Sequence, residues 1–321
     1  MSGRGAVAAL AGVLVGVALA ASFYELYLMR DLRQSAERPE PLSSPTCPPA
    51  TPAPEKTAAK KTAAKKTAVE KKAETKKPQK AVPRESLEKI FADMGTDKGF
   101  QHGYFREYDR ILAPYRDASV SFLEIGVEKG RSFKSWERYF TNYKALVGIS
   151  YGNSQEAPLV TNKEQTQFRY LGSQDDVELL TKICKHRGPF DVVIDDGSHL
   201  PLHQLVSFSN LIKCVKPGGL YVIEDIETSY WNRPNAEIYG YQLSNVGYGH
   251  NGSAVERFKE VVDVVNRKFM TNYKYTKIPG DDLVSSITFA QNMIYMRRKT
   301  EVDDKFFGGP YIHAANVIKQ P

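Results

Sequence analysis

Two pairs of acidic residues follow two apolar runs in the middle of the chain. Val192–Ile194 is followed by Asp195–Asp196, and Leu220–Ile223 is followed by Glu224–Asp225. Apolar runs bounded by turn residues predict buried parallel strands, and ligands bind at the carboxyl ends of such strands. Carboxylates gathered in one crevice repel each other unless a cation lies between them, and oxygen ligands favour a hard ion such as Mg²⁺. These acids therefore predict a divalent-metal site.

A histidine follows the first acidic pair, in the motif Ile-Asp-Asp-Gly-Ser-His that ends at His199. Imidazole can accept a proton near neutral pH, so this histidine suits a general base beside a hydroxyl. Each residue alone also has a structural interpretation, because Asp195 and Asp196 could simply cap the next helix. His203 opens a further alternative, an H-x-x-x-H metal pair with His199, but no third soft ligand stands out.

A glycine turn follows an apolar strand earlier in the chain. The run Val120–Ile125 contains Glu124 and leads into Gly126 and Gly130, and a helix is predicted directly afterwards. Glycine lets a ligand approach the backbone, and the start of a helix presents free N–H groups. The G-x-x-x-G spacing is weak by itself, but after an apolar strand it favours a nucleoside pocket over a dinucleotide site.

Polar residues also end two further predicted strands. Ala145–Ile149 is followed by Ser150, and Phe168–Leu171 leads into Gly172–Asp176. In a parallel sheet these ends lie at the same edge as the glycine turn. The residues predicted to contact a nucleoside cofactor are Glu124, Gly126, Gly130, Ser150, Gln174, Asp175 and Asp195.

A layered sheet is needed to bring these strand ends together. Apolar spacing predicts helices at 86–94, 102–112, 132–139 and 255–269, with a further helix after His199 and a turn at 216–219. Strands are predicted at 120–125, 145–149, 168–171, 192–194, 220–223, 273–278 and 286–296. The alternation predicts an α/β fold with a doubly wound, mostly parallel, seven-stranded Rossmann-like sheet.

Five motifs give residues from about 86 to 298 a specific resemblance. They are G-T-D-K-G at 95–99, F-L-E-I-G-V at 122–127, I-D-D-G-S-H at 194–199, P-G-G-L-Y-V-I-E-D at 217–225 and T-S-Y-W at 228–231. This part of the chain resembles the class I S-adenosylmethionine-dependent methyltransferases. More narrowly, it is similar to the metal-dependent macrolide-sugar O-methyltransferases of the mycinamicin type.

The resemblance implies a role for each of the acids. Asp196, Glu224 and Asp225 would ligate Mg²⁺, and His199 would act as the base. The implied cofactor is S-adenosylmethionine, and the implied acceptor is a hydroxyl of a sugar or glycan. Two vicinal hydroxyls on one metal would be polarised and oriented toward the methyl group.

One position departs from the pattern of such enzymes. Where the second strand often ends in an acid that holds the ribose, this chain has Ser150. Three rival functions stay open: methylation of another hydroxylated molecule such as a lipid head group or catechol, a degenerate binding domain, which Ser150 favours, and a nucleic-acid-associated protein. Charge argues against the last. Residues 1–83 hold 14 of the 44 basic and 7 of the 37 acidic residues, so the remainder holds 30 of each and no nucleic acid is expected.

The N-terminal third predicts a different kind of segment. Residues 6–29 are long and apolar enough to cross a bilayer, so residues 1–30 are predicted to be a membrane anchor, with a cleaved signal peptide as the alternative. Residues 31–83 are rich in Pro, Lys and Ala and predict a disordered stalk, either merely solvated or bound to anionic lipid or glycan.

These features complete the predicted organisation. The methyltransferase-like domain would span 84–321, in a single-pass membrane protein of the Golgi or endoplasmic reticulum that contacts the membrane through its N-terminal helix. A glycosylation triplet at 251–253 would suit that location, and a homo-oligomer is left open. Cys47, Cys184 and Cys214 have no metal-like spacing and are predicted to be free thiols.

Overall fold

A computed structural model of the protein describes residues 84–153, 157–233, 235–270 and 274–307. The predicted anchor at 1–30 and stalk at 31–83 lie outside these residues, as does Cys47. Within the described ranges, no helix combines the length and apolarity needed to cross a membrane.

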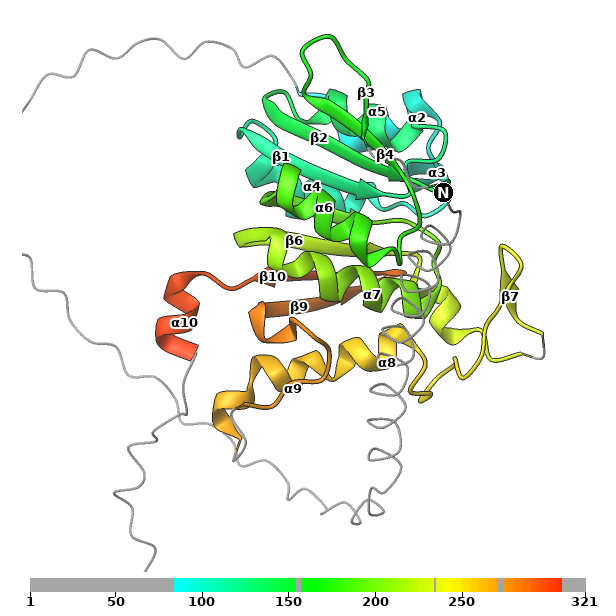
Figure 1. Ribbon diagram of the computed structural model, residues 1–321, viewed down its shortest axis with the longest axis vertical. Helices are drawn as coiled ribbons and strands as arrows, with labels where there is room; N and C mark the ends of the chain where they lie inside the picture. Colours follow the sequence, from blue (N-terminus) through cyan, green and yellow to red (C-terminus); the bar gives the residue numbers. More distant parts are fainter. Residues whose placement is uncertain (1–83, 154–156, 234, 271–273, 308–321) are drawn as a thin grey trace, which may run out of the picture. The chain divides into compact units, whose positions relative to one another are not determined.

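The domain is built on one eight-stranded mixed sheet, in the order β3-β4-β2-β1-β5-β6-β10-β9 (Figure 1). Neighbours from β4 to β6 pair in parallel, whereas β3, β10 and β9 each run antiparallel to the neighbour nearer the sheet centre. The strands are β1 (Val120–Ile125), β2 (Tyr143–Ser150), β3 (Leu159–Val160), β4 (Gln167–Leu171), β5 (Phe190–Asp195), β6 (Val215–Glu224), β9 (Val284–Ala290) and β10 (Met293–Arg298). A separate hairpin consists of β7 (Glu237–Ile238) and β8 (Tyr241–Gln242).

Helices cover both faces of the sheet (Figure 1). The α-helices are α2 (Leu87–Met94), α3 (Asp97–Phe100), α4 (Phe105–Leu112), α5 (Arg131–Tyr139), α6 (Val177–Arg187), α7 (Pro201–Leu211), α8 (Ala254–Lys259), α9 (Val261–Val265) and α10 (Glu301–Phe307). Short 3₁₀ turns are η1 (Ala113–Tyr115), η2 (Ile212–Cys214), η3 (Ile226–Tyr230), η4 (Arg267–Phe269) and η5 (Asp281–Leu283). Ser86 caps α2, since its hydroxyl accepts the Lys89 N–H at 3.3 Å.

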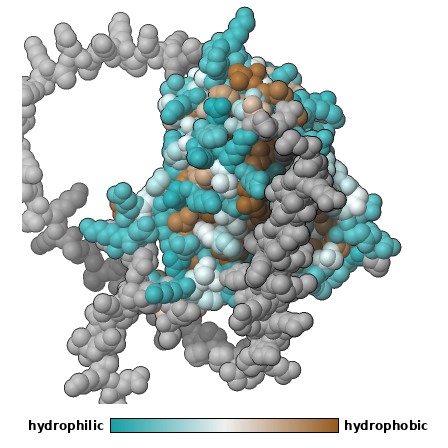
Figure 2. All heavy atoms as spheres, viewed as in Figure 1, coloured by the Kyte–Doolittle hydropathy of each residue, from teal (hydrophilic) through white to brown (hydrophobic). Residues whose placement is uncertain are grey.

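Successive side chains of the central strands pack alternately into two hydrophobic cores, one on each face of the sheet. In β5, Val193 belongs to the core under α6 and α7, whereas Val192 and Ile194 belong to the core under α2, α4 and α5. A strand buried on both faces needs a continuous apolar run, which is why these strands were recognisable from sequence. On the face seen in Figure 2, hydrophilic residues cover much of the coloured domain and hydrophobic ones show in separate areas.

The sheet differs from its prediction in four places, the first three of which lie within strands that it contains. It has eight strands instead of seven because of the two-residue β3. The predicted turn at 216–219 is an irregularity inside β6. The predicted single strand 286–296 is instead the hairpin β9–β10, which reverses at Asn292 with a φ of 57°.

The strand predicted at 273–278 is not formed over its described part, 274–278. Asp281 explains why, because its buried carboxylate accepts the backbone N–H groups of Lys277 and Ile278 at 2.6 and 2.7 Å and the Thr276 hydroxyl at 2.5 Å. A side chain that satisfies local backbone donors in this way competes with strand pairing.

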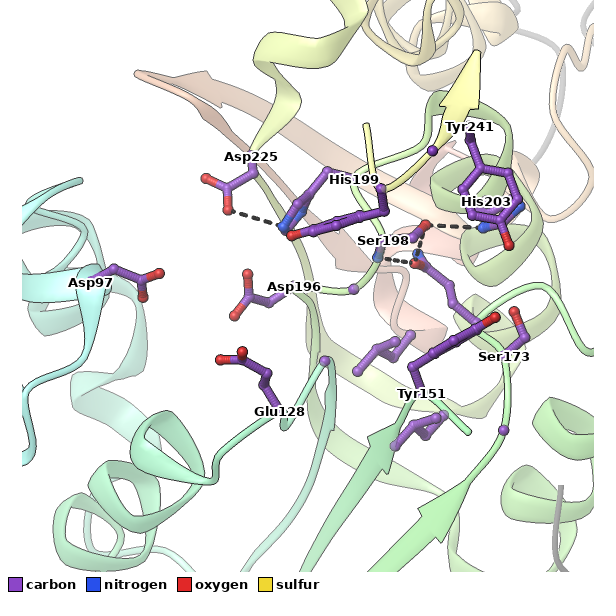
Figure 3. Close-up of a pocket in the computed structure, with 18 residues that line it drawn as sticks. Asp97, Glu128, Tyr151, Ser173, Asp196, Ser198, His199, His203, Asp225 and Tyr241 are labelled. Atoms are coloured by element: carbon purple, nitrogen blue, oxygen red, sulfur yellow. Dashed lines mark hydrogen bonds and ion pairs between the residues drawn. The ribbon is translucent and has the colours of Figure 1, made fainter. Parts of the chain in front are cut away.

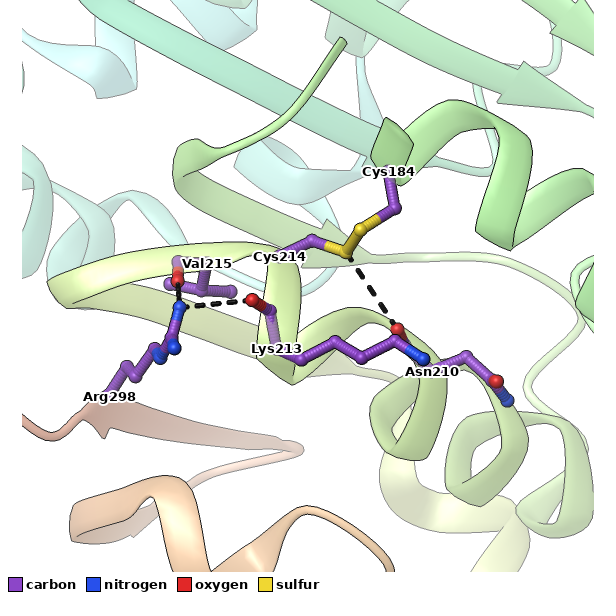
Figure 4. Close-up of a disulfide and its surroundings, with 6 residues drawn as sticks. All are labelled: Cys184, Asn210, Lys213, Cys214, Val215 and Arg298. Carbon is purple, nitrogen blue, oxygen red and sulfur yellow. Dashed lines mark hydrogen bonds between the residues drawn. A yellow bond between two sulfur atoms is a disulfide. The ribbon is translucent and has the colours of Figure 1, made fainter. Parts of the chain in front are cut away.

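The prediction of free thiols at Cys184 and Cys214 is wrong, because the two form a disulfide (Figure 4). Cys184 lies on α6 and Cys214 ends the 3₁₀ turn that follows α7. Their Cα atoms are 5.6 Å apart, within the usual range for a disulfide. The two helices are neighbours on one face of the sheet, and sequence spacing carried no sign of that contact.

Candidate active site

The predicted acids meet at the carboxyl ends of β5 and β6. Asp196 follows β5, Glu224 ends β6, and Asp225 is the next residue. Asp225 has a left-handed backbone with a φ of 51°, which turns its side chain out of the strand line. The strand order places these two strands side by side, so the first expectation from the sequence, a cluster of carboxylates at one edge, is what the fold produces.

A lysine that sequence analysis did not single out lies between two of these acids. Lys98, on α3, is 1% exposed, and its ammonium donates to Asp196 Oδ2 and to Glu224 Oε2 at 2.6 Å. Burial by itself would lower the pKa of Lys98, but the negative charges of Asp196, Glu224 and Glu124 outweigh it and raise that pKa well above its usual value. Lys98 is therefore a permanent internal cation.

Two tyrosines hold the second acidic pair. The Tyr108 hydroxyl donates to Glu224 Oε1, so both oxygens of this carboxylate are engaged by protein groups. The Tyr104 hydroxyl donates to Asp225 Oδ1 at 2.6 Å, and the Asn292 amide donates to the same oxygen at 3.0 Å. Asp225 Oδ2 is left to face His199.

His199 sits beside Asp225 with one nitrogen open to the cavity (Figure 3). Its Nε2 lies 3.6 Å from Asp225 Oδ2, while Nδ1 is buried and has no hydrogen-bond partner in the structure. Its backbone is also left-handed, with a φ of 57°, and its carbonyl accepts the Thr228 hydroxyl at 2.5 Å. The loop thus fixes the imidazole next to the acids.

One group in the described residues can offer ligand atoms to a single metal ion. Asp196, His199 and Asp225 each provide an atom, and these atoms lie within 4.8 Å of one another. Glu224, predicted as a ligand, is not in this group because Lys98 and Tyr108 take its oxygens. His203 is not in it either; its Nε2 lies 3.3 Å from Asp175 instead.

A cavity of about 620 Å³ joins the acid cluster to the glycine turn. At one end it is lined by Asp97, Asp196, His199, Asp225 and Tyr239, and at the other by Gly126, Ile149, Tyr151, Ser173 and Gln174. Of the seven residues predicted to contact a cofactor, Gly126 and Gln174 line this cavity. Gly130 is instead the N-cap residue that precedes α5, with a φ of 78°.

Two of the predicted cofactor residues are buried supports. Glu124 is fully buried, accepts the Trp136 indole N–H at 2.9 Å and has a pKa raised by burial to about 7. Asp195 points under α7, where it accepts the Ser207 hydroxyl and the Gln174 amide, the latter at 2.6 Å; burial raises its pKa to about 7. Gln174 also accepts the Ser198 N–H at 2.7 Å, so it links the ends of β4 and β5.

The remaining two predicted residues are engaged by neighbours. The Ser150 hydroxyl accepts Arg169 Nε at 2.6 Å, and the same guanidinium donates to the Glu128 carbonyl at 2.6 Å. Asp175 accepts the Ser173 hydroxyl and pairs with His203. Neither Ser150 nor Asp175 lines the cavity.

Comparison with known proteins gives relatives of one kind. No family model matches the chain. It is 31% identical over 213 residues to the 8-demethyl-8-alpha-L-rhamnosyl tetracenomycin-C 2'-O-methyltransferase of Streptomyces olivaceus. The matched region covers 64% of this chain and 52% of that relative. It is 36% identical over 157 residues to the mycinamicin VI 2''-O-methyltransferase of Micromonospora griseorubida. This match covers 46% of this chain and 38% of that relative.

Solved structures agree. The MycE methyltransferase from the mycinamycin biosynthetic pathway, in complex with Mg and SAH, superposes with a TM-score of 0.59 and 27% identity, over 72% of this chain and 57% of that one. In sequence and fold, the domain is similar to class I methyltransferases of the mycinamicin type. The chain spans about half the length, or less, of the curated relatives it matches.

The comparisons correct the prediction about where in the cell the protein lies. Localisation to Golgi or endoplasmic-reticulum membranes is wrong, because the relatives are O-methyltransferases of Streptomyces and Micromonospora, bacteria without those organelles. Neither the membrane contact nor an oligomer gains support from these relatives. The apolar residues 6–29, which prompted the membrane prediction, lie outside the described residues.

Unusual backbone conformations gather at this cavity. Among the described non-glycine residues with positive φ, Glu128, His199, Asp225 and Tyr239 all line it. The others outside the cavity are Gln165, Asn235, Asn245 and Asn292, and asparagine tolerates this conformation well. Strained residues that persist in a structure cluster at functional sites, and this grouping marks the cavity as one.

Gly126 lines the cavity and packs directly against the Asp196 backbone. Its φ is +94°, and a Cβ placed there would meet the Asp196 carbonyl oxygen at 1.7 Å. Gly126→Ala is expected to lower the free energy of unfolding by about 2–5 kcal/mol and to displace Asp196. Urea denaturation measures this.

Gly130→Ala is the matched control for Gly126→Ala. Its φ is +78° but no atom lies within 4 Å of the added Cβ, so only the backbone cost of about 1–2 kcal/mol should appear. Equal losses for the two variants would show that contact with Asp196 is not what makes glycine necessary at position 126.

Proposed function

We propose that this domain transfers the methyl group of S-adenosylmethionine to a hydroxyl of a sugar or glycan, with the help of a divalent metal ion. The observation that carries the proposal is the convergence of Asp196, Asp225 and His199 in one cavity with the glycine turn after β1. The similarity to sugar O-methyltransferases supports the same chemistry. We also propose that the domain begins near residue 84.

The acid end of the cavity fits a divalent cation. Asp196 and Asp225 offer carboxylate oxygens, the donors that Mg²⁺ prefers, and each has an oxygen that does not bond Lys98 or Tyr104. Glu224 would contribute through Lys98, which bonds both it and Asp196. The ion, when bound, would polarise the acceptor hydroxyls and lower the cost of deprotonating one of them.

The glycine end of the cavity fits the cofactor. Gly126 and Gly172 leave the backbone accessible there, and the Gln174 side chain lies between the ends of β4 and β5. Because Ser150 is bonded to Arg169, we propose Tyr151, which lines the cavity, as the residue at the end of β2 that faces the nucleoside.

His199 completes the reaction as general base. Its Nδ1 is buried and cannot reach the hydroxyl of the sugar. The proton of that hydroxyl is therefore taken by Nε2, which faces Asp225. S-adenosylmethionine, when bound, would supply an activated methyl group, and its transfer to the acceptor oxygen would break the bond from the methyl carbon to the sulfonium. The products are the methyl ether, S-adenosylhomocysteine and a proton on the imidazole, which Asp225 stabilises.

Methyl transfer from isotope-labelled S-adenosylmethionine to a panel of simple glycosides tests the function directly. The panel contains methyl α-L-rhamnopyranoside, methyl β-D-glucopyranoside and catechol, with Mg²⁺ present. Label should enter the glycosides. Transfer to catechol alone would move the acceptor class away from sugars, and binding of the cofactor without any transfer would favour a binding domain.

Metal removal should abolish the activity. Excess chelator is expected to lower the transfer rate at least about 100-fold, and added Mg²⁺ should restore it, because the acceptor hydroxyl is no longer polarised. Asp225→Asn should have a similar effect, since it weakens the metal site. Asp263→Asn, an exposed acid on α9, is the matched control and should be active. Full activity in chelator would contradict the proposed site.

A further inference from the structure

The hairpin β7–β8 carries a tyrosine in a turn that does not suit it. Ile238 pairs with Tyr241, so Tyr239 and Gly240 form a two-residue loop, with φ of 51° and 80° respectively. Positive φ at both central positions is the pattern of a type I′ turn, for which Asn-Gly is the favoured sequence. A bulky aromatic at the first position costs conformational energy, and nothing in the hairpin itself offsets that cost.

The Tyr239 ring lines the cavity and is not part of either hydrophobic core. It is 70% exposed, yet it lines the acid end of the cavity, and its ring centroid lies 6.1 Å from that of His199 at an interplanar angle of 40°. An exposed ring beside the proposed base leaves one aromatic face for a ligand.

The second tyrosine of the hairpin serves the other side of the cavity. Tyr241 makes an edge contact with His203, with ring centroids 6.1 Å apart, and the Tyr151 side chain raises the pKa of the Tyr241 hydroxyl. Figure 3 shows Tyr241, His203 and Tyr151 among the residues that line the cavity. Tyr241 is therefore tied to the proposed cofactor end. Tyr239 is the residue of the pair whose ring faces the acids.

We propose that Tyr239 is an acceptor-contacting residue that stacks on the apolar C–H face of a pyranosyl ring and thereby presents a ring hydroxyl to His199. The inference rests on the proposed function and specifies its acceptor as a ring with one apolar face. The strained turn is explained, because an asparagine there would relax the backbone but remove the stacking surface.

Three variants separate stacking from folding. Tyr239→Asn should raise the KM for methyl α-L-rhamnopyranoside, or for the panel glycoside that the wild-type protein methylates best, roughly 3- to 10-fold, with a smaller change in kcat. The same variant should unfold at the same or a higher temperature, because asparagine suits the turn. Tyr239→Phe should keep a KM near that of the wild type. Tyr248→Asn, an exposed tyrosine that does not line the cavity, is the matched control and should change neither value.

Each outcome bears on the inference. A KM for Tyr239→Asn within about twofold of the wild-type value would overturn it while leaving the methyltransferase proposal intact. A lower unfolding temperature for Tyr239→Asn would overturn it as well, by showing that the ring holds the fold. If the wild-type protein methylates no glycoside, the proposed function falls and this inference falls with it.

Discussion

His199→Ala is expected to cut turnover by roughly 10²- to 10⁴-fold, the usual contribution of a positioned general base. The affinity for S-adenosylmethionine should change little, because His199 lies at the acid end of the cavity, away from Gly126 and Gln174. Single-turnover kinetics and calorimetric titration measure the two quantities.

His199→Asn is the matched variant for this experiment. Asparagine accepts the left-handed backbone that His199 adopts, so it keeps the loop but cannot act as a base. Mg²⁺ titration of both variants separates the two roles open to His199. Unchanged metal affinity with lost turnover supports the base, whereas a large loss of metal affinity would make His199 a ligand. Turnover near the wild-type level in both would remove it from the mechanism.

Lys98→Met is expected to lower the free energy of unfolding by about 3–5 kcal/mol, the typical cost of leaving a buried charge without its partner. The ammonium bonds Asp196 and Glu224, and Glu224 is itself 1% exposed, so no water replaces the lost charge there. Urea denaturation measures the loss. Part of it should be recovered in Mg²⁺, because a bound cation would neutralise the same acids.

Lys129→Met is the control for Lys98→Met. Lys129 is a surface residue whose nearest acid, Glu128, is also exposed, so the substitution should change stability by less than about 1 kcal/mol. Equal stability of the two variants would mean that the carboxylates of Asp196 and Glu224 share a proton and need no cation.

The acids could be predicted from the sequence because each follows its own strand. A parallel sheet gathers strand ends whatever the loops do, so Asp196, Glu224 and Asp225 needed no knowledge of remote contacts. Lys98 could not be placed in this way, since it lies 98 and 126 residues from its two partners. The motif G-T-D-K-G was visible, but only the fold pairs its lysine with the acids.

Other misses have the same physical origin. Nothing in the sequence distinguished Gly126 from Gly130, since both belong to the same glycine turn. In the structure a Cβ at Gly126 would meet Asp196, whereas a Cβ at Gly130, the N-cap residue of α5, would meet no atom within 4 Å. Ser150 was a departure from a pattern, and its partner Arg169 is found only through the pairing of β2 with β4. Tyr239 could not be predicted from periodicity, because it lies in a two-residue turn. Such turns are recognised by sequences such as Asn-Gly, and tyrosine is not a residue that indicates one.

The bridge made by Lys98 also decides where this domain can be divided. A fragment that starts at β1 would keep all eight strands of the main sheet but would lack the ammonium that joins the ends of β5 and β6. α3 is therefore as much a part of the acid cluster as the strands are. For chimeras that exchange segments with related methyltransferases, the first suitable junction lies before α2, so that α3 and α4, which supply Lys98 and Tyr108 to the acids, are inherited together with the sheet.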